Sequence, residues 1–139
     1  MFSKILVPID FSPHSDRAVE WATALAKACG ASLYLVHAIH LPHDVQMTGE
    51  WWATLRARAV ARLDACVDVA DAADVSCEAQ ILDERPAEAI LEAAKDSHAD
   101  LIVMGRHGHG ALGHLLLGGI ASKVLRLADV PVLTLRADS

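Results

Sequence analysis

Short apolar runs alternate along this chain with segments in which apolar residues recur every three or four positions. The runs, which have the length and composition of strands, cover residues 4–9, 33–39, 75–82, 100–104 and 132–136. Helical spacing fills the intervals, over residues 13–29, 50–69, 86–97 and 119–128. The pattern therefore predicts five strands alternating with four helices.

Several of the predicted helices carry signals at their ends. Ser12 precedes Pro13, which is the arrangement of an N-cap followed by a first-turn proline, and Gly30 follows the last apolar position of that helix. The second helix has one apolar stripe, which is formed by Trp52, Leu55, Ala59, Leu63, Cys66 and Val67. We expect this stripe to face a sheet.

Strands that are apolar throughout and joined by helices predict a parallel sheet covered on both faces, with right-handed crossovers. This is a doubly wound α/β fold. In such sheets ligands bind beyond the carboxyl ends of the strands, where the strand order reverses. Asp10 and Gly105 both follow the carboxyl end of a predicted strand, so we expect a binding site between them.

Composition narrows the class of protein. With 139 residues, of which 53% are hydrophobic, we expect a single domain. The net charge of −6 argues against nucleic acid as a partner. No uninterrupted run of about 18 apolar residues and no secretory signal after Met1 are apparent, so we expect no membrane insertion and a cytoplasmic location.

Cys29, Cys66 and Cys77 lie far apart in apolar segments, which favours buried reduced thiols over a disulfide or zinc site.

The most informative segment follows the fourth strand. Gly105, Arg106, His107 and Gly108 are followed by Gly118 and Gly119, which stand at the start of an apolar helix. Glycines let backbone N–H groups approach a phosphate, and a helix N-terminus adds partial positive charge. The segment predicts an anion-binding site, at which the surrounding Arg106, His107, His109 and His114 either contact phosphates or form a solvated loop.

Catalytic phosphate-binding motifs fit this segment poorly. Gly113 and Gly118 have the glycine spacing of a P-loop, but Gly119 and Ile120 stand where its lysine and its hydroxyl would be. Gly108, Gly110 and Gly113 match a dinucleotide fingerprint, yet they follow the fourth strand and no ribose-binding acid ends the next one. A receiver domain would need a pair of acids after the first strand. The sequence thus predicts neither a catalytic residue nor a metal ligand.

The chain as a whole resembles the universal stress protein family, in its ATP-binding branch. The resemblance extends over residues 1–139 as one domain and rests on Ile5-Leu-Val-Pro-Ile-Asp10, on Leu35-Val-His-Ala38, on Ala99-Asp-Leu-Ile-Val-Met-Gly105, on Gly105-x2-Gly108-x9-Gly118 and on Asp129-Val-Pro-Val-Leu-Thr134. It implies an adenine-nucleotide α-hydrolase-like, Rossmann-like sheet in the order 3-2-1-4-5.

The resemblance also implies a role for each candidate site residue. Adenine would be held by Asp10 and by the backbone near Ala38, between apolar walls formed by Pro8 and Met104. Ribose and phosphates would meet Gly105, Arg106, His107, Gly108, Gly118, Gly119 and Ile120. The ligand would be ATP, with AMP or ADP as alternatives and magnesium as an open question. For Asp10 the competing interpretation is a helix-capping acid beside Ser12.

One residue departs from the family pattern, which has Ser or Thr after the last glycine. Here that position is Gly119, so a hydroxyl donor to phosphate is missing. A hydrogen bond to a charged group contributes about 1.5–3 kcal/mol, so nucleotide affinity would fall roughly ten- to hundredfold without compensation. Ser122, one turn later, is a possible substitute but better fits a solvent-facing position.

Other polar and aromatic residues fit structural roles better. His37 lies in an apolar strand and is expected to be structural, and Trp51 is expected to pack on a neighbouring helix. The histidines that we assign to the surface are His14, His40, His43 and His98.

The last strand would leave an open sheet edge. The family covers it with a second copy of itself, so the resemblance implies a homodimer through the strand that begins with Val132 and ends with Arg136.

Two functions follow from these observations. The first is an ATP-binding regulatory domain of the stress response, which acts through nucleotide-dependent conformation or association and hydrolyses ATP slowly at most. The second is a nucleotide-free dimeric interaction module in which Gly119 marks a decayed site. A transferase that uses bound ATP has only the fold in its favour.

Overall fold

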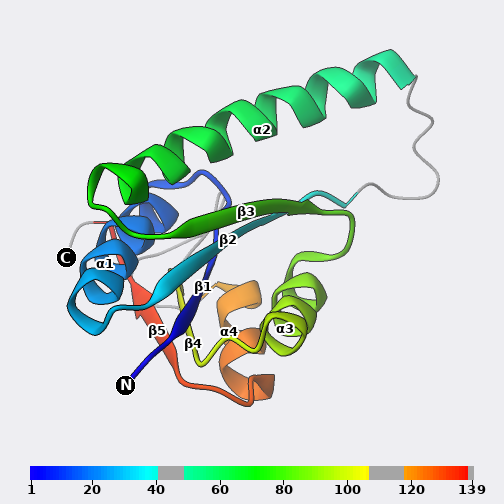
Figure 1. Ribbon diagram of the computed structural model, residues 1–139. Coiled ribbons are helices and arrows are strands. Elements are labelled where there is room, and N and C mark those ends of the chain that lie inside the picture. The colour runs from blue at the N-terminus through cyan, green and yellow to red at the C-terminus, as the bar shows by residue number, and fades with distance from the viewer. Residues whose placement is uncertain (41–48, 107–117, 138–139) are drawn as a thin grey trace.

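The computed structural model describes residues 1–40, 49–106 and 118–137, which form a five-stranded parallel sheet with helices on both faces (Figure 1). The strands are β1 (Lys4–Pro8), β2 (Ser32–Ala38), β3 (Cys77–Leu82), β4 (Leu101–Gly105) and β5 (Val132–Leu135). Their order across the sheet is β3-β2-β1-β4-β5. The predicted doubly wound α/β fold and its strand order are both confirmed.

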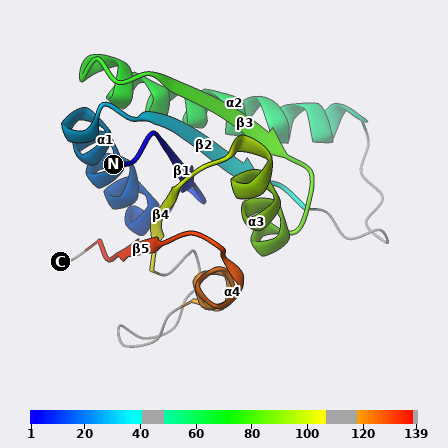
Figure 2. The same cartoon turned by 60° about the horizontal axis from the view of Figure 1, so that its bottom comes forward.

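Two helices cover each face of the sheet (Figure 2). The helices are α1 (Pro13–Cys29), α2 (Gly49–Ala72), α3 (Pro86–Ser97) and α4 (Gly119–Leu127). One core lies between the sheet and α1 with α2, and a second core lies between the sheet and α3 with α4. The predicted stripe of α2 faces the first core, where Leu63 is 3% exposed.

The central strand β1 is enclosed by both cores. Ile5, Leu6 and Val7 are completely buried, because neighbouring residues of a strand point to opposite faces of the sheet. The end signals of α1 act as predicted. The Ser12 hydroxyl oxygen accepts a hydrogen bond from Ser15 N at 3.2 Å, and Gly30 ends the helix in the left-handed region with a φ of 71°.

The largest boundary difference lies between α2 and β3. The helix extends to Ala72, whereas the spacing predicts its end near residue 69, and β3 begins at Cys77 instead of Val75. Val75 is buried, but its N–H donates to Ala70 O at 3.0 Å in the turn that closes α2. An apolar residue in a helix-terminal turn cannot be distinguished by its hydrophobicity from the first residue of a strand.

The cysteines are reduced and only partly buried, so the prediction of buried thiols is half right. Burial, followed by the nearby Asp71 carboxylate, raises the pKa of Cys77 to about 11, which keeps this thiol protonated at neutral pH. Within the described ranges no three His, Cys, Asp or Glu side chains are grouped to hold a metal ion. In the same ranges, none of the helices combines the length and apolarity that a membrane span requires.

Candidate functional site

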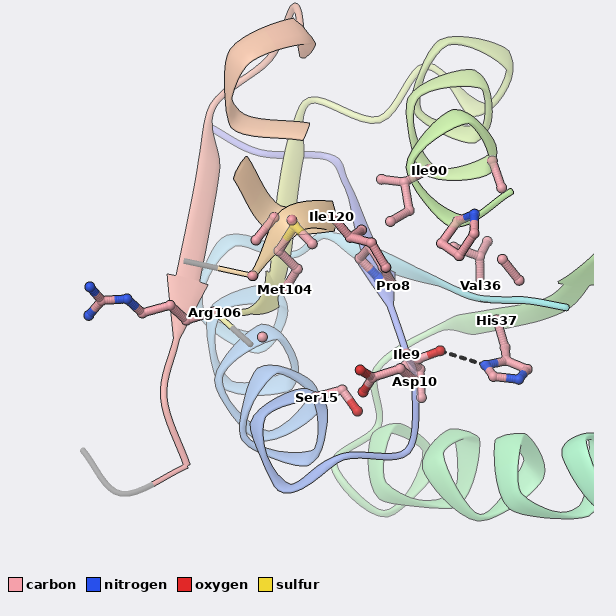
Figure 3. Close-up of a pocket in the computed structure, with 17 residues that line it drawn as sticks. Pro8, Ile9, Asp10, Ser15, Val36, His37, Ile90, Met104, Arg106 and Ile120 are labelled. Carbon is pink, nitrogen blue, oxygen red and sulfur yellow. Dashed lines mark hydrogen bonds between the residues drawn. The ribbon is translucent and has the colours of Figure 1, made fainter. Parts of the chain in front are cut away.

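A cavity of about 330 Å³ opens at the carboxyl ends of β1, β2 and β4 (Figure 3). The chain leaves β1 toward β2 on one side, while β4 lies on the other, so this is the point where the strand order reverses. The predicted site residues that line the cavity are Pro8, Asp10, Ala38, Met104, Gly105, Arg106, Gly118, Gly119 and Ile120. The other two, His107 and Gly108, lie outside the described residues.

The cavity also includes residues that the sequence analysis did not assign to the site. The first turn of α1 contributes Ser15, β2 contributes Val36 and His37, and α3 contributes Pro86, Ala89 and Ile90. In the sequence, Ala89 and Ile90 have the helical spacing of core residues, and both are indeed buried. Periodicity identifies the inward face of a helix but not whether a cavity borders it, so these residues could not be found from the sequence.

Asp10 contacts both the loop between β1 and α1 and the cavity. One carboxylate oxygen, Oδ1, accepts a hydrogen bond from Ser12 N at 2.9 Å, and the side chain lines the cavity beside Ser15 (Figure 3). The N-cap of α1 is Ser12, not Asp10. Asp10 therefore stabilises the turn before the helix and at the same time presents a hydrogen-bond acceptor to the cavity.

The N-terminus of α4 forms the opposite wall. Gly118 N donates to Arg106 O at 2.9 Å, and Arg106 N donates to Leu135 O at 2.7 Å, which holds the start of the helix against the ends of β4 and β5. The first bond within the helix is from Ser122 N to Gly118 O. Since the amides of Gly119, Ile120 and Ala121 precede that bond and no side chain caps α4 in the described chain, these amides can serve an anion.

Two glycines that line the cavity differ in whether the surrounding structure has space for a side chain. A Cβ atom on Gly105 would lie 2.8 Å from Cβ and 2.9 Å from the carbonyl carbon of His14. Glycine is thus required there so that α1 can pack on β4, which differs from the expected role of clearing the approach of a phosphate. A Cβ atom on Gly119 would have no heavy atom within 4 Å, so a side chain fits at that position.

The predicted roles of the other residues differ in outcome. His14 is not a plain surface residue, because it is half-buried and its Nδ1 accepts a hydrogen bond from Ala137 N at 3.0 Å. The structural role of His37 is confirmed, since its Nδ1–H donates to Ile9 O at 2.7 Å. Exposed positions are occupied, as expected, by His40, His98 and Ser122. Trp51 is half exposed and does not line the cavity, while His43 lies outside the described residues.

Comparison with known proteins places these features in a family. The model of the universal stress protein family matches residues 1–136. A universal stress protein of Thermus aquaticus is 41% identical over 137 residues, which cover 98% of this chain and 100% of that relative.

Two solved structures have the same fold. The structure of MJ0577 superposes with a TM-score of 0.82 at 25% sequence identity, and the superposition covers 98% of this chain and 96% of the MJ0577 chain. A universal stress protein solved in complex with cAMP superposes with a TM-score of 0.77 at 28% identity and covers 98% of both chains.

Proposed function

This chain belongs to the universal stress protein family, and we propose that it is a regulatory domain that binds an adenine nucleotide in the cavity at the carboxyl ends of β1, β2 and β4. One observation carries the proposal. A single cavity brings together an apolar slot, the Asp10 carboxylate and the first-turn amides of α4. An adenine nucleotide has an apolar ring with a donor amine at one end and an anion at the other.

The apolar half of the cavity fits the base. This half is lined by Pro8, Val36, Ile90 and Met104. A flat ring that enters between these side chains would bury its apolar surface away from water, which favours binding. The Asp10 carboxylate can accept a hydrogen bond from the exocyclic amine of adenine, and the backbone of Ala38 lies beside the same space. In this proposal Asp10 contributes specificity and the apolar walls contribute affinity.

The polar half fits the phosphates. The amides of Gly119, Ile120 and Ala121 point an array of donors and the positive end of the α4 dipole at the cavity, and Arg106 lies beside them. We propose ATP as the ligand, with AMP and ADP as alternatives and magnesium as an accompanying ion to be tested. The relative that was solved with cAMP supports an adenine nucleotide as the ligand class.

Fast hydrolysis is not part of the proposal. Among the described residues that line the cavity, Asp10 is the acid, and no lysine accompanies the α4 amides. A phosphoryl transfer site usually positions cationic side chains and a base around the terminal phosphate. We therefore expect the nucleotide to act through conformation or association, with slow turnover at most.

Isothermal titration with ATP and MgCl₂ tests nucleotide binding. We expect saturable binding by the wild-type protein, and we expect Asp10→Ala or Gly118→Val to remove it. The matched control is Asp83→Ala, because Asp83 follows β3 but does not line this cavity. If millimolar ATP produces no heat with the wild-type protein, the chain is better described as a nucleotide-free interaction module.

We also propose that β5 pairs antiparallel with its copy in a second subunit, in a cytoplasmic homodimer. β5 is the last strand of the sheet and pairs with β4 on one side only. Pro131 O and Leu135 O accept bonds from β4 and the residue after it, so Thr134 lies at a register position that faces the outer edge. We expect sedimentation to show a dimer at micromolar concentration, and Thr134→Pro to convert it to a monomer.

A further inference from the structure

The loop between β1 and α1 contains a residue in an unusual backbone conformation. Phe11 has a φ of 64°, in the left-handed region that side chains with a Cβ rarely adopt. It lies between Asp10, which lines the cavity, and Ser12, which caps α1. A non-glycine residue in this region persists only where its surroundings hold it, so the contacts of Phe11 are informative.

Two side chains from other elements contact the Phe11 ring. The guanidinium carbon of Arg62, on α2, lies 4.3 Å from the ring centroid, and Arg62 Nη2 donates a long hydrogen bond of 3.5 Å to Phe11 O. The centroids of the Phe11 and His37 rings are 4.4 Å apart, with 40° between the planes. A guanidinium over an aromatic face is attracted by the ring quadrupole.

The stack continues to the wall of the cavity. His37 Nδ1–H donates to Ile9 O at 2.7 Å (Figure 3). The imidazole that contacts Phe11 therefore also holds the residue before Asp10. Ile9 N in turn donates to Val36 O at 2.8 Å. Both neighbours of Asp10 in the chain are therefore held, Ile9 by the His37 bond and Phe11 by its ring contacts with His37 and Arg62.

The Phe11 backbone determines where the Asp10 carboxylate lies. The bond from Ser12 N to Asp10 Oδ1, at 2.9 Å, spans Phe11, so its geometry depends on the dihedral angles of Phe11, which place that amide beside the carboxylate. If Phe11 moved to an extended conformation, the Ser12 amide would turn away from the carboxylate and the side chain of Asp10 would be free to rotate.

From this geometry we infer that Arg62 is a positioning residue for the nucleotide site: through Phe11 it holds the Asp10 carboxylate toward the cavity. Arg62 is exposed, and neither it nor Phe11 lines the cavity. The inference rests on the proposed nucleotide binding for its consequence, but not for the contacts themselves. By linkage, a ligand that binds Asp10 strengthens the contact of α2 with the loop by the same factor.

The first experiment needs no nucleotide. Amide hydrogen exchange of Ser12, followed by NMR, reports the bond to Asp10. We expect exchange to become about two- to fivefold faster in Arg62→Ala, the size expected for an exposed cation–π contact. Asp10→Ala, which removes the acceptor, sets the upper limit. The matched control is Arg58→Ala, one turn earlier on α2 and also exposed, which should leave Ser12 exchange unchanged.

The second experiment is a double-mutant cycle on ATP affinity, measured by titration calorimetry. We expect Arg62→Ala to weaken binding about two- to fivefold, and to weaken it less in a protein that already carries Asp10→Asn, whose amide presents a weaker acceptor. A general structural role of Arg62 would instead lower affinity equally in both backgrounds, which would overturn the inference.

The two experiments separate this inference from the proposed function. A wild-type protein that binds no nucleotide, but in which Ser12 exchange depends on Arg62, would contradict the proposed function and support the positioning of Asp10. Unchanged Ser12 exchange in Arg62→Ala would overturn the positioning role, whether or not ATP binds.

Discussion

The two ends of the sheet differ in how their polar groups are used. At the amino end, the Asp100 carboxylate accepts hydrogen bonds from Ser3 N at 2.9 Å, Ser3 Oγ at 3.0 Å and Lys4 N at 3.2 Å, which ties the start of β4 to the start of β1. At the carboxyl end, the same two strands separate around a cavity of about 330 Å³. One end satisfies its donors internally, and at the other end the first-turn residues of α4 border a cavity.

The direction of the chain explains the difference. In a parallel sheet every strand ends at the same edge, and the next helix begins there, so helix N-termini gather at that edge. Here α1 begins at Pro13 and α4 at Gly119, both after strands that border the cavity. The Ser12 side chain caps α1, whereas α4 has no side-chain cap in the described chain. Among the described residues the start of α3 also lacks a side-chain cap, but the residue it brings to the cavity in its first turn is Pro86, which has no N–H. Of these two helices, α4 is therefore the one whose first-turn amides border the cavity.

The largest effect is expected where the carboxyl end is most tightly packed. In Gly105→Ala the new methyl group would lie 2.8 Å from His14 Cβ, so α1 or β4 must shift. We expect this overpacking to lower the free energy of unfolding by about 1–3 kcal/mol. Thermal unfolding measures the effect. Gly119→Ala is the control, because its methyl group meets open space, and an equal loss in both variants would contradict the packing role of Gly105.

The proposed contact of the α4 N-terminus with phosphate can be tested at Gly119. Gly119→Ser introduces the hydroxyl that the family pattern has at this position, in space that is open. We expect ATP affinity to rise roughly ten- to hundredfold, since a hydrogen bond to a charged group contributes about 1.5–3 kcal/mol. Titration calorimetry of Gly119→Ser beside Gly119→Ala isolates the hydroxyl. Equal affinities in the two variants would show that phosphate does not lie at this position.

A smaller effect is expected at the amino end of the sheet. Although partial burial raises the pKa of Asp100, the hydrogen bonds from Ser3 and Lys4 outweigh it and lower the pKa below its usual value. Stability from this carboxylate is therefore present above the unfolded pKa of about 3.9 and is lost as the pH falls through the lower folded value.

Asp100→Asn tests this arrangement. Because the site is partly exposed, we expect a loss of only about 1 kcal/mol at pH 7. The difference in melting temperature between Asp100→Asn and the wild-type protein should shrink as the pH is lowered below 4. A difference that stays constant from pH 7 to pH 3 would show that the charge of Asp100 contributes nothing.

Much of the fold could be predicted from local patterns. The caps at Ser12 and Gly30, the stripe around Leu63 and the apolar run of β1 each depend on neighbours within one element, and all are confirmed. The misplaced start of β3 at Val75 shows the limit of this reasoning, because a buried turn and a buried strand need the same apolar residue.

The candidate site was only partly accessible to sequence reasoning. Asp10 and Gly119 could be located because strand ends and glycine clusters are visible in the sequence. The packing of Gly105 on His14 and the contact of Arg62 with Phe11 join residues that are 91 and 51 positions apart. No local pattern records such pairs, and the surface assignment of His14 missed its hydrogen bond with Ala137 for the same reason.

By itself, the sequence determined the alternation of strands and helices, the caps of α1 and the position of the glycine segment, because these depend on backbone preferences and on periodic burial. Only the tertiary structure decided which glycine is required for packing, which helix start borders the cavity and how α2 reaches the loop that carries Asp10. Those properties depend on distances between elements, and such distances are set when the two faces of the sheet are packed.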